Sequence, residues 1–131
     1  MIESIKGLDN LRELEDLSLF SNRITVLEGL DNLENLNVLS VGSNEIANLE
    51  HSVNYLHKLR NNLEVLKIID NAFRETSQKE YKGRIIAYLR NLKYLDYELI
   101  ELKERETAES EYKQELENSQ METDDNAGNQ E

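Results

Sequence analysis

Aliphatic residues recur along this chain with a period of 22 residues, and an asparagine recurs in phase with them. A third copy of the pattern comes 27 residues after the second, so about one helical turn is inserted between Leu49 and Leu63. The aligned positions are Leu14, Leu17, Leu19, Asn22 and Ile24, then Leu36, Leu39, Val41, Asn44 and Ile46, then Leu63, Leu66, Ile68, Asn71 and Phe73, and in a partial fourth copy Leu89, Leu92 and Leu95. A repeat of this length predicts stacked units that share one core.

The spacing within each copy predicts its local structure. A Leu-x-Leu segment is a short strand whose alternate residues point into the core, and an asparagine at the following turn satisfies backbone groups that leave the strand. The spacing of three from Ile24 to Leu33 fits a helical or 3₁₀ turn. A leucine-rich amphipathic helix or coiled coil, the alternative, predicts a period of about 3.5 or 3.6 residues without asparagine in phase. The pattern is that of a leucine-rich repeat and predicts an α/β solenoid with short parallel strands on its concave face.

The two ends of this array differ. Ser77 and Glu80 have the spacing of a capping box, and an apolar helical face follows them. That face consists of Tyr81, Ile85, Tyr88 and Leu92, and the closing strand runs through Leu92, Leu95 and Tyr97. We therefore expect a C-terminal helical cap. At the other end the sequence opens at Ile2 within a repeat, so we expect this edge to continue into further repeats of a longer protein, or else to be covered by another protein.

Charge divides the chain into three parts. The whole chain has 27 acidic and 15 basic residues and a formal net charge of -12, which argues against binding to nucleic acid or an anionic membrane. We predict a repeat domain with its cap at 1–97, an acidic charged helix at 98–118 and a disordered acidic tail at 119–131. The charged helix has two interpretations: a solvated helix that follows the cap, or the start of a coiled coil.

Three segments resemble one family in particular. They are LEDLSLFSNRI at 14–24, VLSVGSNEI at 38–46 and AYLRNLKYLDY at 87–97. They resemble the third subunit of the nexin–dynein regulatory complex, and the resemblance extends from residue 2 to about residue 116. The 22-residue repeat is shared with axonemal dynein light chains and phosphatase regulators, but the YLDY closing strand followed by a charged helix narrows the choice.

The resemblance implies a non-enzymatic part of the axoneme of motile cilia and flagella, within the cytoskeleton of the cytoplasm. Such a protein would help regulate motility in the link between neighbouring doublet microtubules. Its partners would be the coiled-coil subunits of the same complex, with dynein arms and doublet microtubules as further contacts. The alternative is a leucine-rich repeat regulatory subunit that binds a dynein motor domain or a phosphatase.

The sequence contains little that could support catalysis. There is no cysteine, and the two histidines, His51 and His57, are six residues apart rather than the three or four that a metal pair on a helix prefers. We expect both histidines at the surface. We therefore predict no enzyme, no cofactor and no metal site.

Binding has better candidates. Residues between the leucines of each strand should project onto the concave face, where several of them are apolar and exposed apolar side chains usually mark an interface. The alternative is that some of them pack against local side chains. The predicted partner-binding residues are Glu15, Asp16, Phe20, Val38, Glu64, Val65, Lys67, Ile69 and Tyr94, and the same rule places Ser18, Asn37, Ser40, Gly42, Lys93 and Asp96 on this face. We predict that this stripe binds a helix or loop of a partner.

Overall fold

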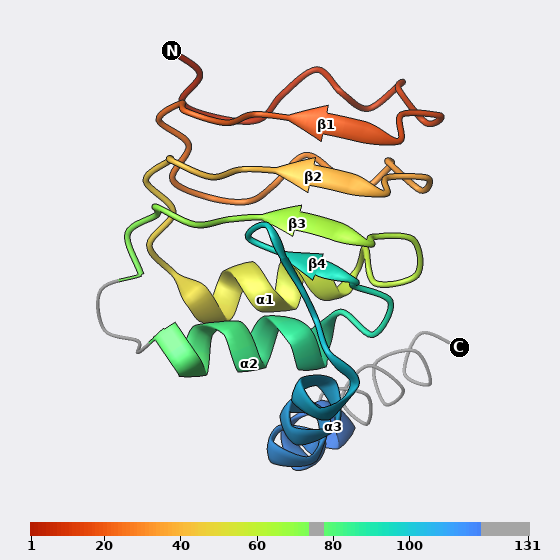
Figure 1. Ribbon diagram of the computed structural model, residues 1–131. Coiled ribbons are helices and arrows are strands. Elements are labelled where there is room, and N and C mark those ends of the chain that lie inside the picture. Colours follow the sequence, from red (N-terminus) through yellow and green to blue (C-terminus); the bar gives the residue numbers. More distant parts are fainter. Residues whose placement is uncertain (74–77, 119–131) are drawn as a thin grey trace.

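A single five-stranded sheet forms one face of the protein. The computed structural model describes residues 1–73 and 78–118 of the chain. The strands lie side by side in the order of the sequence, with the first four parallel and the last antiparallel. The four parallel strands are labelled in Figure 1. They are β1 (Asp16–Ser18), β2 (Val38–Ser40), β3 (Val65–Lys67), β4 (Tyr94–Leu95) and β5 (Glu98–Leu99). The predicted leucine-rich repeat solenoid is therefore confirmed.

Helices and turns form the opposite, convex layer. The return from β1 to β2 consists of turns closed by i to i+3 hydrogen bonds, such as Leu33 N to Leu30 O at 3.1 Å. The residues inserted before the third copy form α1 (Leu49–His57), and α2 (Gln78–Tyr88) precedes β4. In Figure 1 both helices lie on the same side of the sheet. None of the helices within the described ranges is long and apolar enough to cross a membrane.

The core is built from leucines that stack across the strands. Leu17, Leu39, Leu66 and Leu95 occupy matching positions of β1 to β4, and the last three are buried. The convex turns add Leu27, Leu30 and Leu33, which are also buried. The 22-residue shift therefore predicted the strand register correctly, because it superposes Leu17 on Leu39.

The repeated asparagines join successive coils. The side-chain amide of Asn44 donates to the carbonyls of Leu19, Val41 and Gly42 at 3.0 Å each, and its oxygen accepts the Ile24 N–H at 3.0 Å. Asn22 and Asn71 make equivalent bonds in the neighbouring coils. These asparagines satisfy backbone groups that the short strands leave without partners.

The predicted cap is present at the end of the array. Tyr81, Ile85 and Tyr88 of α2, together with Leu92, are buried as one face. Ser77 lies outside the described residues, so the proposed capping box stays a prediction. Tyr97, expected within the closing strand, is instead exposed, because the chain turns at Asp96 and Tyr97 with φ angles of 49° and 73°.

The prediction that residues between the leucines face solvent is wrong for Asp96, which is buried. In earlier coils the carbonyl at this strand position accepts a hydrogen bond from the preceding strand, as when Lys67 O accepts the Val41 N–H at 2.8 Å. At Asp96 the chain turns away, and the buried carboxylate takes over this role. Its Oδ1 accepts the Ile68 N–H at 2.7 Å and the Ile69 N–H at 3.0 Å.

The second carboxylate oxygen of Asp96 joins the sheet to the cap. The Tyr81 hydroxyl donates to Asp96 Oδ2 at 2.5 Å. Burial and the neighbouring carboxylate raise the pKa of Tyr81 well above its ordinary value. The tyrosine therefore stays protonated and remains a donor to Asp96.

The charged segment differs from the helix predicted over 98–118. Residues 98–99 add the antiparallel strand β5, so α3 (Leu102–Glu111) begins later, and a further helical run covers 113–118. The segment packs against α2 rather than standing free in solvent: at Gly83 of α2, a Cβ atom would lie 3.2 Å from Cε2 of Tyr112. An ion pair between Arg84 and Glu115 also joins the two.

Arg105 makes the main polar contacts of α3 with the cap. Its guanidinium donates to the carbonyls of Ile86 at 3.1 Å, Leu89 at 3.3 Å and Leu92 at 2.6 Å. These carbonyls lie at and after the C-terminal end of α2, where a positive charge is favourable. Because Ala108 is the buried residue of α3, docking of this helix depends largely on Arg105.

Replacing Arg105 with alanine should release α3 from α2. Without the guanidinium three carbonyls lose a charged donor, an effect of about 1–3 kcal/mol. Hydrogen exchange measured by mass spectrometry should show faster exchange across 102–118 while β1 to β3 keep their protection. Lys103→Ala, a change at an exposed position of the same helix, should have little effect. Equal exchange in both variants would contradict the role assigned to Arg105.

Candidate protein-binding face

An apolar row crosses the outer face of the sheet. Val38, Val65, Tyr94 and Leu99 are paired one after another across β2 to β5, and Asp16 continues the row on β1. Each valine and the tyrosine stands next to a buried leucine of its strand, so it points away from the core. Tyr94 is 45% exposed and Leu99 59% exposed. Four apolar side chains thus lie in contiguous positions on the solvent side of the sheet.

A polar row runs beside the apolar one. It consists of the residues that precede each strand, Glu15, Asn37, Glu64 and Lys93, whose backbones are joined by hydrogen bonds from coil to coil. Lys93 Nζ lies 3.1 Å from Glu64 Oε1. Hydrogen bonds from Asn37 and then from Lys93 lower the pKa of Glu64 below its ordinary value. This carboxylate therefore stays ionised on the open face.

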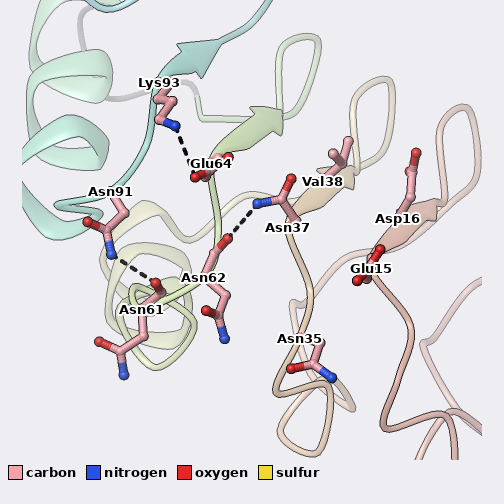
Figure 2. A pocket seen from close by; sticks show the side chains of 10 residues that line it. All are labelled: Glu15, Asp16, Asn35, Asn37, Val38, Asn61, Asn62, Glu64, Asn91 and Lys93. Carbon is pink, nitrogen blue, oxygen red and sulfur yellow. Dashed lines mark hydrogen bonds and ion pairs between the residues drawn. The ribbon is translucent and has the colours of Figure 1, made fainter.

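The polar row and Val38 of the apolar row border a hollow of about 920 Å³ (Figure 2). Glu15, Asp16, Val38 and Glu64, four of the predicted binding residues, line it. The remaining lining residues are Asn35, Asn37, Asn61, Asn62, Asn91 and Lys93. The hollow is thus lined mainly by amides and carboxylates.

Several of these asparagines form a second set of contacts between coils. The side-chain amide of Asn35 donates to Arg12 O at 3.4 Å, and Asn62 donates to Glu34 O. Asn91 donates to Asn61 O at 2.8 Å, one of the bonds drawn in Figure 2. The repeat pattern did not predict this series, although each asparagine directly precedes the leucine that leads into a strand. These contacts hold the edge of the hollow in place.

The other predicted residues lie nearer the carboxyl ends of the strands. Lys67 Nζ lies 4.7 Å from the centre of the Tyr97 ring, a cation–π distance. Phe20 is 50% exposed, but its ring lies over Gly42, where a Cβ atom would be 3.4 Å from Cδ2 of the phenylalanine. Ile69 is half-buried, and Ser40 and Gly42 are buried rather than exposed as predicted. Phe20 therefore packs partly against its own sheet, in line with the alternative interpretation.

The two histidines lie in different environments. His51 is exposed, as predicted, but His57 is half-buried, which corrects its placement at the surface. Its Nδ1 lies 2.8 Å from Tyr88 O. Within the described part of the chain, no three histidine, aspartate or glutamate side chains are grouped so that they could hold a metal ion.

Comparison with known proteins identifies the class. The model of the leucine-rich repeat family matches residues 1–123. The chain therefore belongs to the leucine-rich repeat family, whose fold typically serves as a scaffold for protein–protein interaction rather than as an enzyme. No curated protein sequence matches the chain.

The solved structures with a similar fold include two protein complexes. One is the Drosophila melanogaster SNF/U2A′ complex, with a TM-score of 0.66 and 25% identity over 82% of this chain and 61% of that chain. The other is Chaetomium Mex67:Mtr2, with a TM-score of 0.56 and 21% identity over 72% of this chain and 62% of that chain. The chain thus spans about three fifths of the length of each. Neither match concerns the nexin–dynein regulatory complex, so that finer assignment is a proposal.

Proposed function

We propose that this protein is an interaction scaffold whose concave sheet face binds a helix or loop of another protein. The observation that carries this proposal is the row of Val38, Val65, Tyr94 and Leu99, which is contiguous across four strands. Its two valines are half-buried, and Tyr94 and Leu99 are exposed. Exposed apolar side chains in contact with each other favour a protein interface. Carboxylates of Glu15, Asp16 and Glu64 beside the row would add selectivity for basic groups on the partner.

We further propose that the scaffold works in the ciliary axoneme as part of the nexin–dynein regulatory complex. The support is the sequence resemblance over three segments and the acidic helix that follows the closing strand. On this proposal the partner is a coiled-coil subunit of the complex, and dynein arms or doublet microtubules lie nearby. A helix of a coiled coil could place its apolar stripe along the row on β2 to β5.

A second candidate is a regulatory subunit that binds one folded globular partner, such as a dynein motor domain or a phosphatase. The fold similarity to the SNF/U2A′ complex favours this candidate, since U2A′ there assembles with another protein. Proximity labelling from the chain in a ciliated cell separates the two. Labelled axonemal coiled-coil subunits would support the first candidate, and labelled phosphatase subunits or dynein heavy chains alone would support the second.

Replacing Val65 with glutamate should reduce partner capture about tenfold or more. The new carboxylate would lie in the centre of the apolar row, where a partner that covers it must bury an unpaired charge. Pull-down from extracts of ciliated cells measures the capture, and circular dichroism and thermal melting check the fold.

Val26→Glu is the matched control, because Val26 is an exposed valine outside the row. It should capture the partner as the unaltered chain does. Full capture by the Val65→Glu variant would remove the apolar row from the proposed interface.

A further inference from the structure

A second hollow, of about 520 Å³, lies on the helical side of the molecule. Its lining comes from the C-terminal ends of α1 and α2, from the end of α3 and from the helical run 113–118. Basic side chains gather there: Arg60 follows α1, Arg90 follows α2, and Lys113 begins the helical run 113–118. His57 lines the same hollow. Since the chain has a net charge of -12, three cations in one hollow are a local reversal of its overall charge.

The two arginines are held by neutral partners. Arg60 Nη1 donates to His57 O at 2.9 Å, and Arg90 donates to Asn61 Oδ1. Across 1–73 and 78–118, neither arginine nor Lys113 forms an ion pair. Two carboxylates also line the hollow, of which Glu109 pairs with Arg105 at 3.3 Å, leaving Glu117 as its other acid. The lining therefore has one more cation than carboxylates, and one of those carboxylates also pairs with Arg105.

The charges of two of these basic groups act on the His57 ring. Its Nδ1 must carry a hydrogen, because the neighbouring Tyr88 carbonyl can only accept. Burial chiefly lowers the pKa of His57, and the charges of Arg60 and Arg90 lower it further, although the Tyr88 carbonyl acts in the opposite direction. Both arginines thus lie close enough to act on one ring in the hollow. An anion bound there would offset them.

Apolar side chains also line the hollow. Ala87 and Tyr88 are buried, and Leu116 is half-buried at its side. A small inorganic ion would leave this surface uncovered, whereas a peptide with acidic and apolar side chains would use both features.

We propose that this second hollow binds an acidic peptide segment of a partner protein. Carboxylates of the segment pair with Arg60, Arg90 and Lys113, and an apolar side chain of the segment packs on Ala87 and Leu116. The second hollow lies on the convex side, away from the apolar row. It would therefore allow the protein to make a second contact within the same assembly.

The experiment is an NMR titration of the full chain with the peptide EELEELEE, blocked at both ends. Amide signals around Arg60, Arg90 and Lys113 should shift, and the pKa of His57 should rise when the peptide is bound. The variant Arg60→Gln/Arg90→Gln/Lys113→Gln should bind the peptide about tenfold more weakly. The variant Lys6→Gln/Arg12→Gln/Arg23→Gln removes the same charge from exposed positions of the first coils, and should bind as the unaltered chain does.

A second peptide, QQLQQLQQ, tests whether the carboxylates matter. Equal binding of this peptide would overturn the proposal, as would equal weakening by both triple variants, which would indicate an effect of net charge alone. The absence of shifts in the unaltered chain at millimolar EELEELEE would overturn it as well.

Discussion

Replacing Leu66 with alanine is expected to lower the free energy of unfolding by about 2–5 kcal/mol. Leu66 is buried in the middle of the leucine row, between Leu39 and Leu95. Each coil buries its leucines only against its neighbours, so a cavity at this position weakens the contacts with both adjacent coils. Urea unfolding followed by circular dichroism measures the change.

Leu102→Ala is the matched control for this experiment. Leu102 is 73% exposed at the start of α3, so the same chemical change should alter the free energy of unfolding by no more than about 0.5 kcal/mol. If the two variants have the same free energy of unfolding, Leu66 does not occupy the shared core and the pairing of Leu39, Leu66 and Leu95 is wrong.

Asp96→Ala is expected to lower the free energy of unfolding by a comparable amount, for a different reason. It leaves the N–H groups of Ile68 and Ile69 and the Tyr81 hydroxyl without their shared acceptor in a buried place. Each of the three unsatisfied groups costs about 1–3 kcal/mol, so we expect a total loss of at least about 3 kcal/mol. The same urea unfolding experiment measures this loss.

Asp96→Asn tests the hydrogen bonds without the negative charge, because asparagine keeps the shape of aspartate and one acceptor oxygen. The asparagine oxygen can still accept both N–H groups, and its amide can donate to the Tyr81 hydroxyl, which then acts as acceptor. We therefore expect this variant to retain most of the stability that alanine loses. A loss as large as that of Asp96→Ala would show that the hydrogen-bond geometry does not explain the role of Asp96.

The repeat period predicted most of the solenoid because register follows from it. Once Leu17, Leu39 and Leu66 are aligned in the sequence, parallel strands that share a core must pair at these residues. The same alignment predicts which neighbours point outward, and so the repeat alone is enough to place Val38 and Val65 side by side on the outer face. For these residues the candidate site could be predicted from the sequence.

The end of the array could not be predicted in the same way. The turn at Asp96 and Tyr97 depends on two residues with positive φ, a local conformation that a periodic pattern does not contain. It buries Asp96, exposes Tyr97 and adds β5, which brings Leu99 into the apolar row. The hydrogen bonds of Asn35 and Asn91 likewise depend on how far adjacent coils are offset, which the spacing of leucines leaves open.

The central claim is that the apolar row on the sheet face contacts the partner. Replacing Val65 with the photoreactive residue benzoylphenylalanine, in an otherwise unaltered chain, tests this most directly when the cross-linked protein is identified by mass spectrometry in ciliated cells. We predict a cross-link from position 65 to a coiled-coil protein, and none from the same residue placed at position 26. A partner cross-linked from position 26 but not from position 65 would contradict the claim.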